Sequence, residues 1–199
     1  EMQLQGNPPD VYTNNLFVER VIEPEAFDHR VLGKAMTLVM KLNLVKKARI
    51  MRAIGQEYGV DNIVCSYKCW SSKRLSRWSI VPERKKSDYL VRYLVIAATT
   101  GALSKGYWGP LICNRDGLID DGSTSYRAID NVTFYKQVRG DLTNFKVREA
   151  FYAYANIIKL LSGAKCVQAI NADNGIHHFI FTIKSHKQLH IIWTRDRGG

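Results

Sequence analysis

The chain has 199 residues, of which 46% are hydrophobic and 11% aromatic, and its formal net charge is +11. This composition favours a folded globular protein, and no apolar run reaches the roughly 18 residues that a membrane-spanning helix needs. The positive charge indicates an anionic partner, a role that an acidic glycan, a nucleic acid or a membrane surface would each fill. Because residues 1–10 are polar and contain prolines, we expect no signal peptide and a cytoplasmic protein.

The first two thirds of the sequence alternate between strand and helix patterns. Apolar residues at helical spacing predict a helix over 34–58 that Gly59 ends, and a second helix that starts at Ser87 and ends at Gly101. Short apolar runs predict strands over 11–18, 62–67 and 106–113. Strands that alternate with helices indicate crossover connections, and therefore a parallel sheet.

The pattern changes near residue 164. A helix is predicted over 145–161, capped by Thr143 or Asn144 and ended by Gly163. Alternating apolar residues then predict hairpin strands over 166–170, 176–183 and 189–194. The predicted fold class is α/β, with a βα barrel-like region over residues 1–163 and a small antiparallel β unit over residues 164–199.

The four cysteines do not form a disulfide or metal pattern. Cys65, Cys69, Cys113 and Cys166 lie in or beside apolar runs, and we expect buried free thiols. His177 and His178 fall in a predicted hairpin strand, far from any zinc-ligand spacing. We therefore expect neither a metal nor another cofactor.

Taken in order, four segments resemble the C-terminal part of a (β/α)8-barrel glycoside hydrolase with its trailing β-domain. The resemblance is to family-39-like enzymes of the bacterial surface-polysaccharide type. Residues 15–20 resemble the sixth barrel strand, 63–70 the seventh, 107–112 the eighth and 148–164 the closing helix. The resemblance implies a partial barrel and action on, or binding of, an acidic saccharide.

Two departures from that family bear on catalysis. A barrel of this kind needs about 250 residues, and this sequence has room for only three of the eight strands. The family nucleophile is a glutamate at the end of the seventh strand, where this chain has Ser66, Tyr67 and Lys68. The chain is an O-glycosyl hydrolase only if missing strands, from an upstream region or another chain, complete it. Otherwise it binds without cleaving.

Barrel enzymes place their sites at the carboxyl ends of the strands. Glu19 is then the candidate acid/base residue, with a solvated salt bridge to Arg20 as the favoured alternative. Trp108 is a candidate for stacking on a sugar ring, with core packing as the alternative. The predicted saccharide-binding residues at the strand ends are Asn15, Tyr67, Lys68, Trp70 and Trp108.

A basic loop over residues 71–86 separates the second strand from the second helix. Its cations include Arg74, Arg77, Arg84 and Lys85, which are predicted to bind acidic groups of a saccharide. A solvated loop is the alternative. Two other functions stay open: nucleic-acid binding, which the charge and nearby aromatics suggest, and a structural role in completing another chain's barrel.

Overall fold

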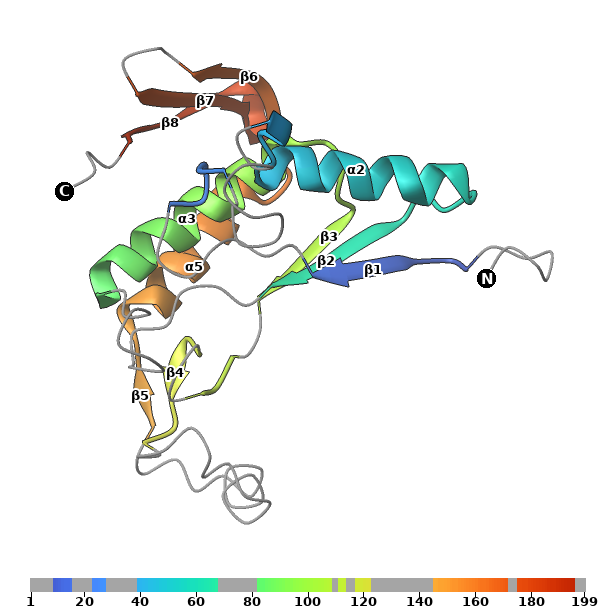
Figure 1. The fold of residues 1–199 in the computed structure, drawn as a ribbon. Coiled ribbons are helices and arrows are strands. Elements are labelled where there is room, and N and C mark those ends of the chain that lie inside the picture. Colours follow the sequence, from blue (N-terminus) through green and yellow to red (C-terminus); the bar gives the residue numbers. More distant parts are fainter. Residues whose placement is uncertain are drawn as a thin grey trace.

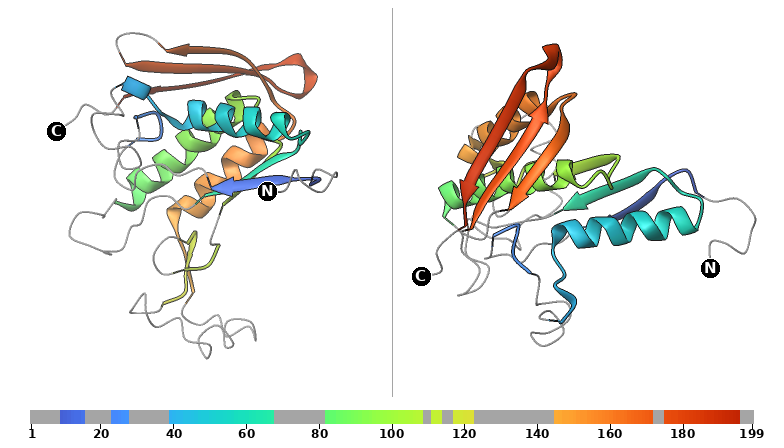
Figure 2. Two further views of the ribbon diagram at one scale, coloured as in Figure 1. Left: turned by 45° about the vertical axis from the view of Figure 1, so that its right-hand side comes forward. Right: turned by 90° about the horizontal axis from the view of Figure 1, so that it is seen from above.

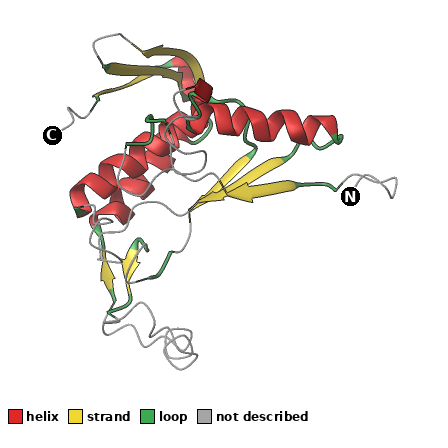
Figure 3. Cartoon of the chain, in the orientation of Figure 1, coloured by secondary structure: helices red, strands yellow, loops and turns green. Residues whose placement is uncertain are grey.

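The computed structural model describes residues 9–15, 23–27, 39–67, 82–108, 111–113, 117–122, 145–171 and 175–195. Strands alternate with helices in the first part of the chain, and three strands and one short 3-10 helix follow the last described α-helix (Figures 1 and 3). The elements are β1 (Tyr12–Asn15), α2 (Leu44–Glu57), β2 (Ile63–Tyr67), α3 (Glu83–Thr99), β3 (Lys105–Trp108), β4 (Ile119–Asp120), β5 (Lys146–Val147), α5 (Glu149–Leu161), β6 (Lys165–Asn171), β7 (Ile176–Thr182), η3 (Lys184–His186) and β8 (Gln188–Thr194).

The predicted parallel sheet is confirmed. Strands β1, β2 and β3 lie side by side in chain order, and both pairs are parallel, with Thr13 beside Val64 and Ser66 beside Tyr107. Helix α2 lies between β1 and β2 in the chain, and α3 lies between β2 and β3. Within the described ranges no further strand pairs with the outer edge of β1 or β3, so these strands do not form a closed barrel.

Helix α2 is shorter than predicted. Lys41 has a φ of 46° and Asn43 is extended, so a continuous helix over 34–58 is wrong, and the structure does not describe residues 34–38. The Asn43 side chain caps the new start by accepting a hydrogen bond from the Lys46 amide at 3.0 Å. Near the other end, a Cβ on Gly55 would lie 2.3 Å from Ile63 Cδ1, so glycine permits the close approach of α2 to β2.

Helix α3 begins at Glu83, four residues before the predicted start at Ser87. The Ser87 hydroxyl donates to the Glu83 carbonyl at 3.0 Å instead of capping the helix. Lys86 is fully buried, and its ammonium donates to the Gly117 carbonyl at 2.9 Å. The hydrogen bond to Gly117 offsets part of the cost of burying this ammonium and ties the first turn of α3, which the sequence assigns to the basic loop, to a distant segment.

The structure also corrects two other predicted boundaries, the end of β3 and the start of α5. Strand β3 ends at Trp108 rather than at residue 113, and Ile112 makes only an isolated bridge to Ile119. Helix α5 begins at Glu149 rather than at residue 145, because β5 pairs there with β4. Three predicted helix ends are confirmed by left-handed glycines, with φ of 74°, 61° and 73° at Gly59, Gly101 and Gly163.

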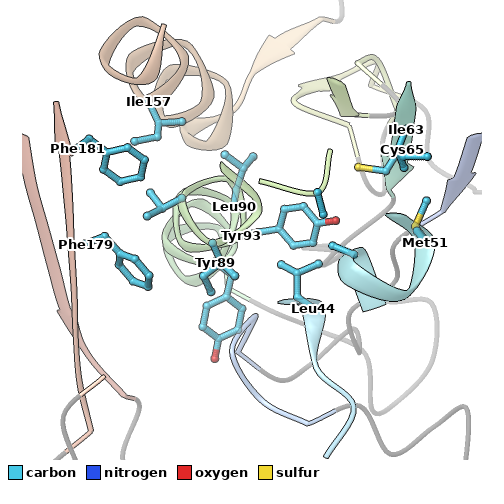
Figure 4. Packing of buried hydrophobic residues seen from close by; sticks show 14 of the residues in the cluster. Leu44, Met51, Ile63, Cys65, Tyr89, Leu90, Tyr93, Ile157, Phe179 and Phe181 are labelled. Carbon is cyan, nitrogen blue, oxygen red and sulfur yellow. The ribbon is translucent and has the colours of Figure 1, made fainter. Parts of the chain in front are cut away.

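The predicted antiparallel unit is also confirmed. Strands β6, β7 and β8 pair in that order, and Phe179 lies between Ala169 and Ile191 (Figure 2). Helix α3 lies between the two sheets: Phe179 and Phe181 approach it from one side, and Ile63 and Cys65 face the core from the other (Figure 4). The hydrophobic core therefore extends across the predicted boundary at residue 164, and that boundary stays a prediction.

Candidate functional site

The carboxyl ends of the parallel strands bring three predicted binding residues to one edge. Asn15, Tyr67 and Trp108 are the last residues of β1, β2 and β3. Tyr67 pairs with Trp108, and Asn15 pairs with the preceding Ser66. The strand register thus aligns the three strand ends at which the sequence predicts a ligand site.

The Trp108 side chain packs largely into the protein. It is half-buried against the hydrophobic core, and its ring centroid lies 6.4 Å from that of Tyr154 on α5. Its neighbour Tyr107 is 55% exposed and lies on the opposite face of β3, since side chains alternate along a strand. The sequence predicts no binding role for Tyr107, although this residue precedes Trp108, which is predicted to stack on a sugar ring.

The predicted basic loop is partly helix. Arg84 and Lys85 are exposed in the first turn of α3, and the Lys85 ammonium lies 5.3 Å from the ring centroid of Tyr89. Their assignment to a loop is therefore wrong, although both remain available to solvent. The remaining predicted site residues lie outside the described residues; they are Glu19, Lys68, Trp70, Arg74 and Arg77.

A second polar site lies between α3 and the antiparallel sheet. The Glu25 side chain is only 7% exposed and is ion-paired with Arg92 of α3. The Trp193 indole N–H on β8 donates to the same carboxylate oxygen at 3.1 Å. His177 of β7 brings its Nε2 to 3.8 Å from that oxygen. A buried carboxylate is thus surrounded by groups from three elements.

His177 is oriented by two further neighbours. Its Nδ1 lies 2.8 Å from Asn171 Oδ1, and its ring stacks on Trp193 with centroids 5.5 Å apart. Burial is the largest influence on the His177 pKa and lowers it; the Glu25 carboxylate opposes this, and Arg92 adds to the lowering. Among the described residues, neither His177 Nε2 nor Glu25 Oε2 has a hydrogen-bond partner, and both atoms are buried.

A cavity of about 300 Å³ adjoins this polar cluster. Its lining includes Glu25 and His177, together with Asn43 and Arg49 of the α2 region. Sequence reasoning treated His177 as an ordinary hairpin residue and did not select Glu25. No local pattern signals the site, because its members come from segments far apart in the chain.

Other polar clusters in the described residues serve the fold. Arg148 is ion-paired with Glu83 and with Asp120, the latter at 3.0 Å, so it connects α3, β4 and the start of α5. Cys65 and Cys113 are buried, as predicted, and Cys166 is half-buried. Burial raises the pKa of Cys65 to about 11, which disfavours the reactive thiolate.

Neither a metal site nor a membrane helix emerges from the described ranges. No group of three or more histidine, cysteine, aspartate or glutamate side chains is arranged there to hold a metal ion. None of the helices described is both long and apolar enough to span a bilayer. In comparisons with known proteins, no family model, curated protein or solved structure matches this chain.

Proposed function

We propose that this chain is a carbohydrate-active module of the glycoside-hydrolase type that binds an acidic saccharide at the carboxyl ends of β1, β2 and β3. The common edge formed by the three strand ends carries the proposal. Successive parallel strands are neighbours in barrels, as they also are within each half of a doubly wound sheet. The sheet here follows chain order over its three strands. In barrels of this type the ligand lies at the carboxyl ends of the strands.

Several exposed groups support recognition of an acidic sugar. Tyr107, one residue before the end of β3, offers an exposed aromatic face for stacking. Arg84 and Lys85 lie in the first turn of α3, the helix that follows β2. A crossover helix between parallel strands starts near the carboxyl end of the preceding strand, so these cations are on the proposed ligand side.

The proposed module does not hydrolyse glycosides efficiently by itself. Retaining glycosidases need two carboxylates about 5 Å apart. The end of β2 carries Ser66 and Tyr67 instead of a carboxylate, and the buried Glu25 is committed to Arg92. A catalytic pair would require strands added at the outer edges of β1 or β3, from another chain or from residues outside those described.

The test compares an acidic oligosaccharide with a single-stranded oligonucleotide of equal charge at about 0.15 M salt, where non-specific phosphate binding is weakened. We expect the saccharide to bind more tightly. Replacing Tyr107 with alanine should weaken the saccharide about tenfold and the oligonucleotide less, because stacking on a sugar depends on shape. Tyr152, which is 59% exposed on α5, provides the matched control Tyr152→Ala. Equal losses for both ligands would favour nucleic-acid binding instead.

Charge reversal and turnover complete the test. Arg84→Glu with Lys85→Glu should weaken both ligands, since long-range attraction depends little on the shape of the anion. An activated aryl glycoside should not be turned over by the isolated chain. Turnover that disappears in Glu19→Gln would contradict the proposal that the module binds without cleaving.

A further inference from the structure

We propose that the outer edge of β3 is a docking surface for an extended, acidic segment of a partner protein, which adds to the parallel sheet as a further strand. This interaction goes beyond saccharide binding at the strand ends. A groove of about 670 Å³ adjoins β3. Its lining comes from α3, from the segment that leads into β3, from β3 itself and from α5, and includes Leu94, Leu103, Lys105, Tyr107, Ile158 and Leu161.

The outer edge of β3 is open. Among the described strands β3 pairs only with β2, and the backbone of residues 105–107 makes no hydrogen bond to described residues outside that pairing. Gly106 is exposed, and because glycine has no side chain the exposed surface is backbone. Unpaired backbone groups on an accessible edge are a template for another strand.

The groove follows this edge of β3. Trp108 points toward α5, where its ring lies 6.4 Å from that of Tyr154. Lys105 and Tyr107 point to the opposite face of the strand, because side chains alternate. Lys105 and Tyr107 nevertheless line the same groove as Ile158 of α5. The groove therefore reaches both faces of β3, and it does so past the unpaired edge.

The groove wall offers apolar surface that an added strand would cover. Ile158 is 44% exposed, and Leu94, Leu103 and Leu161 are only partly buried. Helices of α/β folds pack on the strands of their sheet, so a strand beside β3 would lie against these side chains. In strand addition the main chain supplies hydrogen bonds, and alternate side chains enter the groove. The partner segment should therefore carry apolar residues at every second position.

The charges around the groove favour an acidic partner. Lys105 is an exposed cation of the groove wall, and no described residue of the lining is acidic. Lys184 lies near the end of α5: a Cβ on Gly163, the residue after Ser162 of the lining, would lie 3.8 Å from the Lys184 Cε. The chain carries a net charge of +11, so a second copy would be repelled and an acidic segment attracted.

The experiment measures the binding of three short labelled peptides to the whole chain by fluorescence anisotropy. The first has valine at alternate positions, threonine between them and glutamates at both ends. The second has lysine in place of each glutamate, and the third has proline in place of the central valine. The first should bind at least about tenfold more tightly than the others, because lysine repels the groove cations and proline disrupts strand pairing.

Two variants locate the binding on the groove. Ile158→Asp replaces an apolar groove residue with a like charge and should weaken the glutamate peptide at least about tenfold. Ile54→Asp is the matched control, because Ile54 is 40% exposed on α2 and lies outside the groove lining; it should weaken binding less than about threefold. Circular dichroism checks that both variants fold.

Lys105→Glu tests the choice of an acidic partner. Because Lys105 is exposed on the groove wall, this variant should bind the glutamate peptide more weakly and the lysine peptide more tightly than the unchanged chain does. An unchanged preference between the two peptides would contradict the role of charge.

Three further outcomes would overturn strand addition at this edge. They are no saturable binding of the glutamate peptide up to about 1 mM, equal affinity for the proline peptide, and equal weakening in Ile158→Asp and Ile54→Asp. Ile158 has no part in the proposed saccharide site, so Ile158→Asp should leave the affinity for the acidic oligosaccharide unchanged. Either proposal can then fail without the other.

Discussion

The Trp193 indole N–H donates a hydrogen bond to the Glu25 carboxylate at 3.1 Å, although the two residues lie 168 positions apart in the chain. The ion pair between Glu25 and Arg92 adds the central helix to the same cluster. The segment after β1, helix α3 and the last strand are thus held together at one buried carboxylate.

Replacing Trp193 with phenylalanine tests this hydrogen bond. The variant keeps an aromatic ring beside Phe179 and His177 but removes the donor to Glu25. We expect the free energy of unfolding to fall by about 1.5–3 kcal/mol, the range for hydrogen bonds to charged groups. Urea unfolding measures it, and Tyr152→Phe on the exposed face of α5 should change it by less than about 0.5 kcal/mol. Similar values for the two variants would contradict the importance of this bond.

The stability should depend on pH through His177. Its pKa in the folded protein is below the ordinary value of 6.5, because burial outweighs the Glu25 carboxylate and Arg92 and Arg195 add to the lowering. The unfolded chain therefore takes up this proton first as pH falls, and stability declines from pH 6.5 downward through the lower, folded-state pKa. Unfolding measured across this window should show a shallower decline in His177→Phe. An unchanged slope would argue against this assignment.

Phe181 tests the packing of the antiparallel sheet on the helices. Its side chain is 1% exposed in the shared core, and Phe181→Ala should cost about 3–5 kcal/mol. Ile192 on neighbouring β8 is 60% exposed, and Ile192→Ala should cost less than about 1 kcal/mol. Urea unfolding of both variants makes the comparison. A small loss for Phe181→Ala would mean that the sheet packs loosely.

Gly55→Ala should destabilise the protein, although alanine favours helices over glycine by about 1 kcal/mol. A Cβ at this position would lie 2.3 Å from Ile63 Cδ1 and 2.8 Å from the Val60 carbonyl oxygen. The required shift should cost about 1–3 kcal/mol. Thermal and urea unfolding would reveal the sign, and a stabilised variant would show that α2 and β2 separate easily.

The order and type of the main elements could be predicted from local patterns. Helical spacing with a terminal glycine identified the helices that end before Gly101 and Gly163, and period-two alternation identified the three C-terminal strands. These signals are local because each element buries one face. They also distinguished the parallel region from the antiparallel one.

Element starts and the buried polar site could not be predicted in this way. The sequence predicts that Lys86 belongs to a basic loop. In the structure Lys86 is buried in α3, where its ammonium donates a hydrogen bond to the Gly117 carbonyl. Glu25 carries no local sign that Arg92 and Trp193 will surround it. Such contacts depend on tertiary structure, which single-sequence periodicity does not contain.

The shared core also limits how far the chain can fold while it is being synthesised on the ribosome. Helix α3 is synthesised well before Phe179 and Phe181, which cover one of its sides, and Trp193 is made later still. A nascent chain that has not yet released β7 and β8 must expose part of the apolar surface of α3. We therefore expect products truncated before Ile176 to be held by chaperones or degraded, and native structure to form only after β7 and β8 have been made.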